Sequence, residues 1–149
     1  MSDVSNIKIV KAAVSDAQSI ARLESECIEC PWSEKDIADS LTNPLYDFYK
    51  AETGGETVGY IGVSWCLDEG NVCNVALRKD YRRKRIGKNM ISGVMDEGVK
   101  RNAKRLFLEV NASNAAAIAL YEKSGFRTVY SRPRYYGEET AIVMSLETD

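Results

Sequence analysis

A single carboxylate interrupts the most apolar stretch of the sequence. Glu109 lies between Leu108 and Val110 in the run RLFLEV, residues 105–110. Burying an unpaired charge costs free energy, so this carboxylate must be paired, hydrated in a cleft or held in its neutral form. Two interpretations remain open: a general base, or a strand-end glutamate that forms a salt bridge with an arginine. The chain contains no histidine, so acid–base chemistry falls to Glu, Asp, Tyr, Lys or Cys.

Asn114 and Tyr121 are the next candidates for chemistry. They lie two helical turns apart and so project from the same stripe of a predicted helix. An asparagine amide can bind the amides of an extended ligand, and a tyrosine hydroxyl can donate a proton to a departing thiolate. The alternatives are structural: a helix N-cap for Asn114 and a half-buried aromatic for Tyr121. These two residues alone do not distinguish the possibilities.

A basic turn precedes a helix in the middle of the chain. A short apolar strand ends at Leu77, and the apolar spacing from Ile86 onward predicts a helix with Gly87 in its first turn. The first N–H groups of a helix attract anions, and glycine lets a phosphate approach the backbone, so a pyrophosphate is the expected ligand. A solvated basic turn or a nucleic-acid patch remains as an alternative. The charges around this point come from Arg82, Arg83, Lys84, Arg85 and Lys88.

The composition indicates one globular domain, residues 1–149, with a net charge of −2. This charge balance argues against a general nucleic-acid binder, so we expect no direct nucleic-acid partner. No apolar run is long enough to span a bilayer and no signal-peptide pattern begins the chain, so we expect a cytoplasmic protein without a membrane partner. Its four cysteines are then expected to be reduced thiols, and their spacing does not fit a zinc site.

The elements that must position these residues form a mixed α/β sheet with helices on both faces. A helix separates strand 72–77 from strand 105–110, which indicates that these two strands run parallel. Strand 105–110 is apolar enough to be covered on both faces. A turn is expected at 68–71, and Gly54-Gly55 predicts a hairpin. The expected strands are 7–11, 46–52, 57–67, 72–77, 105–110, 126–130 and 140–146. One helix is expected to begin after residues 15–16, and three more are expected at about 33–41, 86–101 and 114–123.

Taken together, these residues resemble the GNAT superfamily of acetyl-CoA-dependent N-acetyltransferases. The phosphate motif of that family has the form Q/R-x-x-G-x-G/A, and residues 82–87 (RRKRIG) match its first and last fixed positions, with Arg85 where the first glycine is usual. The similarity narrows to the RimI-type ribosomal-protein-alanine N-acetyltransferases and covers nearly the whole chain in the same order. The matching segments are CPWS at 30–33, LEV at 108–110, ASNAAAIALYE at 112–122, GF at 125–126, and Arg132 through Tyr135-Tyr136.

The resemblance implies a mostly antiparallel twisted sheet of about seven strands, with acetyl-CoA held between a splayed parallel pair. It implies Glu109 as general base and Tyr121 as general acid, with direct attack of the acceptor amine on the thioester. Asn114 is expected to contact the pantetheine arm. The other expected cofactor-binding residues are Val75, Ala76 and Leu77 beside that arm, and Arg82, Arg83, Lys84, Arg85, Ile86, Gly87 and Lys88 around the pyrophosphate. Trp32, Tyr135 and Tyr136 are candidates for binding the first residues of the acceptor, and the alternative for each is a packing role.

The reaction that the resemblance implies is acetyl transfer from acetyl-CoA to the α-amine of an N-terminal alanine or serine, with a small-subunit ribosomal protein as the expected partner. A small-molecule amine or antibiotic as acceptor, and a non-catalytic acyl-CoA-binding module, remain alternatives. We expect no metal, and a monomer or weak dimer.

Overall fold

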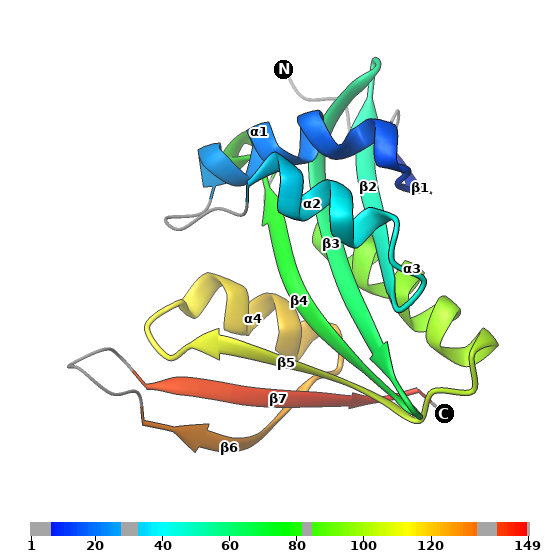
Figure 1. Cartoon of the computed structure of the whole chain (residues 1–149). Coiled ribbons are helices and arrows are strands. Elements are labelled where there is room, and N and C mark those ends of the chain that lie inside the picture. Colours follow the sequence, from blue (N-terminus) through cyan, green and yellow to red (C-terminus); the bar gives the residue numbers. More distant parts are fainter. Residues whose placement is uncertain (1–6, 28–32, 82–84, 134–139, 149) are drawn as a thin grey trace.

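A computed structural model describes residues 7–27, 33–81, 85–133 and 140–148. In these ranges the chain forms one seven-stranded sheet with helices on both faces (Figure 1). The strands are β1 (Lys8–Lys11), β2 (Tyr46–Thr53), β3 (Glu56–Cys66), β4 (Glu69–Leu77), β5 (Arg105–Asn111), β6 (Arg127–Arg132) and β7 (Ala141–Glu147). The α-helices are α1 (Ala17–Cys27), α2 (Glu34–Leu41), α3 (Ile86–Lys100) and α4 (Ala115–Lys123), and short 3-10 turns cover Val14–Asp16 and Lys79–Tyr81.

The strand order is β1-β2-β3-β4-β5-β7-β6, and every neighbouring pair is antiparallel except β4 and β5. The predicted mixed sheet of about seven strands with one parallel pair is therefore confirmed. The parallel pair is joined through α3, as a crossover connection requires.

The parallel ladder between β4 and β5 is short. It runs from Glu69 opposite Arg105 to Val72 opposite Leu108, while the ladder between β4 and β3 continues to Leu77. Cys73 is an extra residue on β4 at a register shift in the β3 ladder, and such a bulge bends and twists its strand. The two strands consequently diverge just past the bulge (Figure 1).

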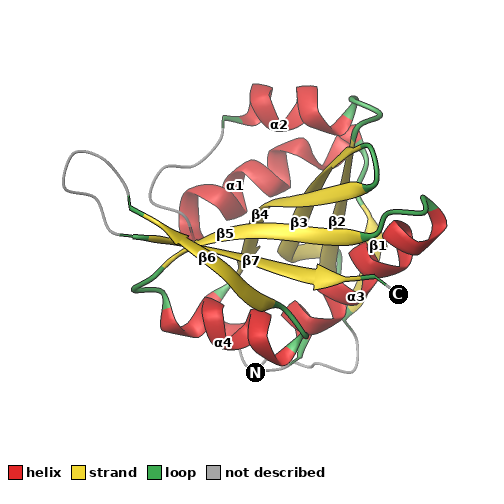
Figure 2. Ribbon diagram, turned by 90° about the horizontal axis from the view of Figure 1, so that it is seen from below, coloured by secondary structure: helices red, strands yellow, loops and turns green. Residues whose placement is uncertain are grey.

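Helices α1 and α2 lie on one face of the sheet and α3 and α4 on the other (Figure 2). A hydrophobic cluster lies between the helices and the sheet on each face. On one face, α1 and α2 pack Ile20 and Ile37 against Phe48 and Tyr60. On the other face, α3 and α4 pack against the larger cluster. Its fully or nearly fully buried members include Ile61, Val63, Ile86, Met90, Leu106, Leu108, Tyr121 and Phe126.

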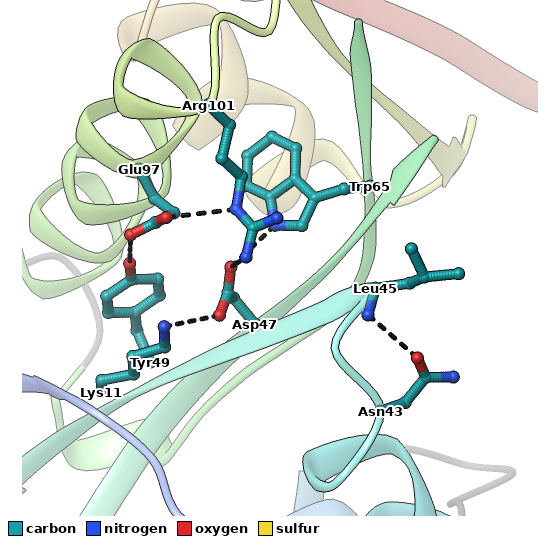
Figure 3. A network of polar contacts seen from close by, with 8 residues as sticks. All are labelled: Lys11, Asn43, Leu45, Asp47, Tyr49, Trp65, Glu97 and Arg101. Atoms are coloured by element: carbon teal, nitrogen blue, oxygen red, sulfur yellow. Dashed lines mark hydrogen bonds and ion pairs between the residues drawn. The ribbon is translucent and has the colours of Figure 1, made fainter. Parts of the chain in front are cut away.

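The C-terminal end of α3 is tied to the sheet by a polar network around a buried carboxylate (Figure 3). Asp47 is 4% exposed and accepts a hydrogen bond from Trp65 Nε1 at 2.8 Å. Lys11 and Arg101 form ion pairs with it at 2.8 and 3.0 Å. Arg101 also binds Glu97 at 3.1 Å and lies over the Trp65 ring. Because these partners compensate the buried charge of Asp47, the packing of α3 against the sheet depends on keeping them in place.

Two local expectations were wrong. The turn after β3 is shorter than 68–71, because Leu67 adopts a left-handed conformation (φ 55°) and β4 already begins at Glu69. Strand β5 is covered on one face only: Leu106, Leu108 and Val110 are buried, whereas Glu109 points to the other face. The apolar run misled because its two charges, Arg105 and Glu109, and its aromatic Phe107 all lie on the face that is left open, while the aliphatic residues fill the other face.

Candidate active site

Glu109 is the first residue of β5 beyond the ladder with β4. Its side chain is 35% exposed and borders a cavity of about 340 Å³ on the face of the sheet opposite α4. Strands β4, β5, β6 and β7 form the wall. The described residues that line it are Asn71, Val72, Phe107, Leu108, Glu109, Tyr130, Arg132 and Val143. Glu109 therefore borders a cavity, which is one of the environments that the sequence allowed for its carboxylate.

The Glu109 carboxylate is also paired. Arg132 Nη1 lies 3.3 Å from its Oε2 atom, and Arg132 Nη2 donates a hydrogen bond to the Tyr130 hydroxyl at 3.4 Å. The hydrogen bond to Tyr130 and the charge of Glu109 together raise the pKa of Arg132. The sequence left open whether Glu109 forms a salt bridge or lies in a cleft, and in the structure it does both.

Tyr121 lies on α4, on the opposite face of the sheet from Glu109. It is 8% exposed, belongs to the cluster around α3, and meets the Phe126 ring edge-on at 5.8 Å. Burial raises its pKa to about 12, so the phenol keeps its proton at neutral pH. Tyr121 is not among the described residues that line the cavity. The two predicted catalytic groups therefore lie on opposite faces of the sheet and do not share this cavity.

Asn114 is the N-cap of α4. Its Oδ1 atom accepts a hydrogen bond from the Ala117 N–H at 3.2 Å, which confirms the structural interpretation of this residue. The side chain is exposed, and its amide N–H groups are chemically able to donate to a ligand. Ligand contact by Asn114 remains a prediction.

The three predicted strand residues on β4 lie past the bulge. Val75, Ala76 and Leu77 pair with Ile61, Tyr60 and Gly59 of β3 on one edge, and the β5 ladder does not reach them on the other. The Ala76 side chain is buried against α1 and α2. An extended ligand along this stretch would therefore be recognised by the backbone.

The start of α3 holds the second half of the predicted cofactor site. Arg85 is the N-cap residue and adopts φ 65° and ψ 6°, the left-handed conformation that glycine favours. The side chains of Arg85 and Lys88 are exposed, whereas Ile86 is buried in the core. A Cβ at Gly87 would lie 2.8 Å from Leu120 Cδ2, so a larger residue here would require the end of the Leu120 side chain to shift. Arg82, Arg83 and Lys84 lie outside the described residues.

The three residues predicted to hold the acceptor, Trp32, Tyr135 and Tyr136, also lie outside the described residues. The sequence analysis missed Tyr130 and Phe107, which line the cavity beside Glu109. The available signal was alternation: Tyr130 and Arg132 are two positions apart on one strand and so share a face. Knowing that this face meets Glu109 requires the pairing of β6 with β7 and of β7 with β5.

Neither a membrane-spanning helix nor a metal-binding cluster occurs in the described ranges. None of the helices there is long and apolar enough to cross a bilayer. The same ranges contain no group of three or more Cys, Asp or Glu side chains arranged to hold a metal ion.

The fold and the diverging strand pair define the class of protein. Residues 15–126 match the model of the acetyltransferase (GNAT) family, and the chain belongs to this family of acyltransferases. Enzymes of this family use acetyl-CoA.

Individual relatives confirm the narrower resemblance to the RimI type. The [ribosomal protein bS18]-alanine N-acetyltransferase of Escherichia coli is 36% identical over 136 residues, which cover 89% of this chain and 91% of the relative. The N-alpha-acetyltransferase RimI of Mycobacterium tuberculosis is 30% identical, with 99% and 95% covered. The crystal structure of the Escherichia coli ribosomal-protein-S18-alanine N-acetyltransferase matches with a TM-score of 0.86 at 34% identity, covering 95% of this chain and 94% of that one.

Proposed function

We propose that this enzyme transfers the acetyl group of acetyl-CoA to the α-amine of an N-terminal alanine or serine of a ribosomal protein. The similarity to bS18-alanine N-acetyltransferases supports the acceptor. The observation that carries the chemistry is the position of Glu109, which follows the last paired residue of the parallel ladder and faces the cavity.

The residues present fit a thioester of coenzyme A. The β4 edge at Val75–Leu77 can pair with the amides of an extended arm, and Asn114 can donate to it. The N-terminus of the 15-residue α3, with Arg85 and Lys88 exposed beside it, suits a pyrophosphate. Bound there, acetyl-CoA supplies an activated acetyl group and leaves as the free thiol.

Two groups of the chain move protons in this proposal. Glu109 accepts a proton from the acceptor amine as the C–N bond forms. Tyr121 donates its phenolic proton to the sulfur that departs as the C–S bond breaks, and its raised pKa of about 12 keeps that proton available. Because the parallel strands diverge directly beside Glu109, a ligand between them is accessible to groups on both faces of the sheet.

The acceptor is proposed to be an α-amine rather than a lysine side chain. An α-amine with a pKa near 8 needs about 1.4 kcal/mol to be neutral at pH 7, whereas a lysine near 10.4 needs about 4.6 kcal/mol. A single carboxylate acting as base, without a histidine, can remove the proton from an α-amine more readily than from a lysine, because the α-amine has the smaller deprotonation cost.

A thiol-release assay with acetyl-CoA and synthetic peptides tests the proposal. Peptides that begin with Ala or Ser should release free thiol and gain one acetyl group at the N-terminus by mass spectrometry, whereas N-terminally blocked peptides should not. Glu109→Gln and Tyr121→Phe should each lower kcat by about 100-fold or more with little change in acetyl-CoA affinity.

Matched controls use the same chemical changes elsewhere. Glu122→Gln on the exposed side of α4 and Tyr46→Phe on β2 should keep normal turnover. Normal turnover in Glu109→Gln would refute the base assignment. Acetylation of small amines with no activity on any peptide would refute the acceptor.

A further inference from the structure

We propose that Arg132 is a tuning residue whose positive charge prevents Glu109 from holding the acceptor amine in its unreactive ammonium form. This inference rests on the proposed function, because it concerns the protonation of the amine that Glu109 serves. Its basis is the ion pair between the two side chains across the cavity.

The register of the sheet brings these side chains to one place. Glu109 on β5 lies opposite Val143 on β7, which in turn lies opposite Tyr130 on β6. Arg132 is two residues further along β6 and shares the face of Tyr130. The long side chain reaches back diagonally, so that its guanidinium contacts both the Tyr130 hydroxyl and the Glu109 carboxylate.

The charges around this point are few in the part of the chain that is described. Glu109 and Arg132 are the two formal charges among the described residues that line the cavity. Strand β4 contributes the neutral Asn71, and β7 contributes the apolar Val143. The next charge on this face of β5, Arg105, is paired with Glu69 at 3.8 Å and Glu147 at 3.7 Å, and it does not line the cavity.

Without the Arg132 guanidinium, the negative charge of Glu109 would attract an ammonium ion more strongly. The protonated acceptor would then bind tightly but could not attack the thioester, because its lone pair is occupied. A guanidinium 3.3 Å from the carboxylate cancels most of this attraction. The pKa of the bound amine is consequently lower in the presence of Arg132 than it would be without Arg132. Tyr130 serves as the second anchor that holds Arg132 in this position.

The test is the pH dependence of steady-state kinetics with an Ala-initiated peptide. In Arg132→Gln, kcat and KM at pH 7 should fall together by about three- to tenfold, because the ammonium form binds unproductively. The acid limb of the kcat profile should move to higher pH, and kcat above that limb should return to the wild-type value. Arg132→Lys keeps the charge and should keep the wild-type profile.

Two further variants complete the experiment. Tyr130→Phe removes the hydrogen-bond acceptor for Arg132 and should shift the limb in the same direction by a smaller amount. Arg127→Gln, an exposed arginine on the same strand that does not line the Glu109 cavity, should leave the profile unchanged.

The possible outcomes separate this inference from the proposed function. An unmoved acid limb in Arg132→Gln, or a fall in kcat of equal size at every pH, would overturn the inference while leaving the acetyltransferase assignment intact. A wild-type enzyme that acetylates no peptide α-amine would overturn the function itself. Because Arg132 is 56% exposed on an edge strand, its replacement is not expected to impair folding.

Discussion

Replacing Arg85 by glycine should stabilise the protein while weakening its affinity for coenzyme A. Arg85 has φ 65°, and a residue with a Cβ in this region costs about 1–2 kcal/mol. Glycine removes that cost, but it also gives the unfolded chain more conformational freedom, which cancels about 0.4–1 kcal/mol of the gain in stability. The free energy of unfolding should therefore rise by a net amount of about 0.5–1 kcal/mol. Urea denaturation with an unchanged m-value measures it.

The same substitution removes a positive charge beside the N-terminus of α3. If Arg85 contacts a phosphate, coenzyme A should bind about tenfold more weakly, the size expected for one charge-assisted hydrogen bond. Isothermal titration calorimetry with coenzyme A measures this change without requiring turnover.

Arg85→Ala is the matched control, because it removes the charge but keeps the left-handed strain. It should lose affinity as Arg85→Gly does, without the gain in stability. Leu67→Gly repeats the backbone change at φ 55° far from the candidate site and should raise stability alone. If Arg85→Gly were less stable than Arg85→Ala, the strain argument would be refuted. Unchanged affinity in both Arg85 variants would remove Arg85 from the phosphate site.

Three further predictions concern stability. Gly87→Ala should change the free energy of unfolding by less than about 1 kcal/mol in chemical denaturation, because its Cβ would meet only the end of the Leu120 side chain at 2.8 Å and helices favour alanine over glycine, and a loss above about 2 kcal/mol would mean that Leu120 cannot shift. Asp47→Ala should cost about 1–3 kcal/mol, because it leaves the buried indole N–H of Trp65 without its acceptor while the exposed Lys11 and Arg101 can turn to water, and a neutral result would contradict the network. The pKa of Tyr121 is about 12 in the folded protein and about 10 in the unfolded chain. The contribution of Tyr121 to the free energy of unfolding is therefore complete below pH 10 and falls by about 3 kcal/mol as the pH rises to 12. Tyr121→Phe should remove this part of the alkaline slope in pH-dependent denaturation, and an identical slope in both proteins would refute it.

Local signals in the sequence were sufficient where neighbouring residues decide the structure. Ser33 caps α2 by accepting from the Asp36 N–H, at the start of the helix predicted over about 33–41, and Gly54-Gly55 turns the predicted β2–β3 hairpin. Asn114 caps α4 by the same kind of short-range bond. Such contacts span a few positions and depend little on the rest of the fold.

Features that depend on distant pairing were not predictable from one sequence. The bulge at Cys73 has no composition signal, because it arises from the register between β3 and β4. The face on which Tyr121 lies follows from the packing of α4 against α3, not from the helical stripe that Tyr121 shares with Asn114. Tyr130 became a cavity residue only through the order β5-β7-β6, which reverses the chain order of the last two strands.

The short β4–β5 ladder limits how stable this architecture can become. Continuing the pairing past Val72 and Leu108 would add backbone hydrogen bonds in the middle of the sheet, and removing the extra residue at Cys73 is the simplest route to it. A continuous sheet would resist unfolding better, yet it would occupy the β4 edge along which we propose that the cosubstrate binds. Selection for thermostability in this enzyme should therefore alter helix packing and surface charge while leaving the strand irregularity untouched.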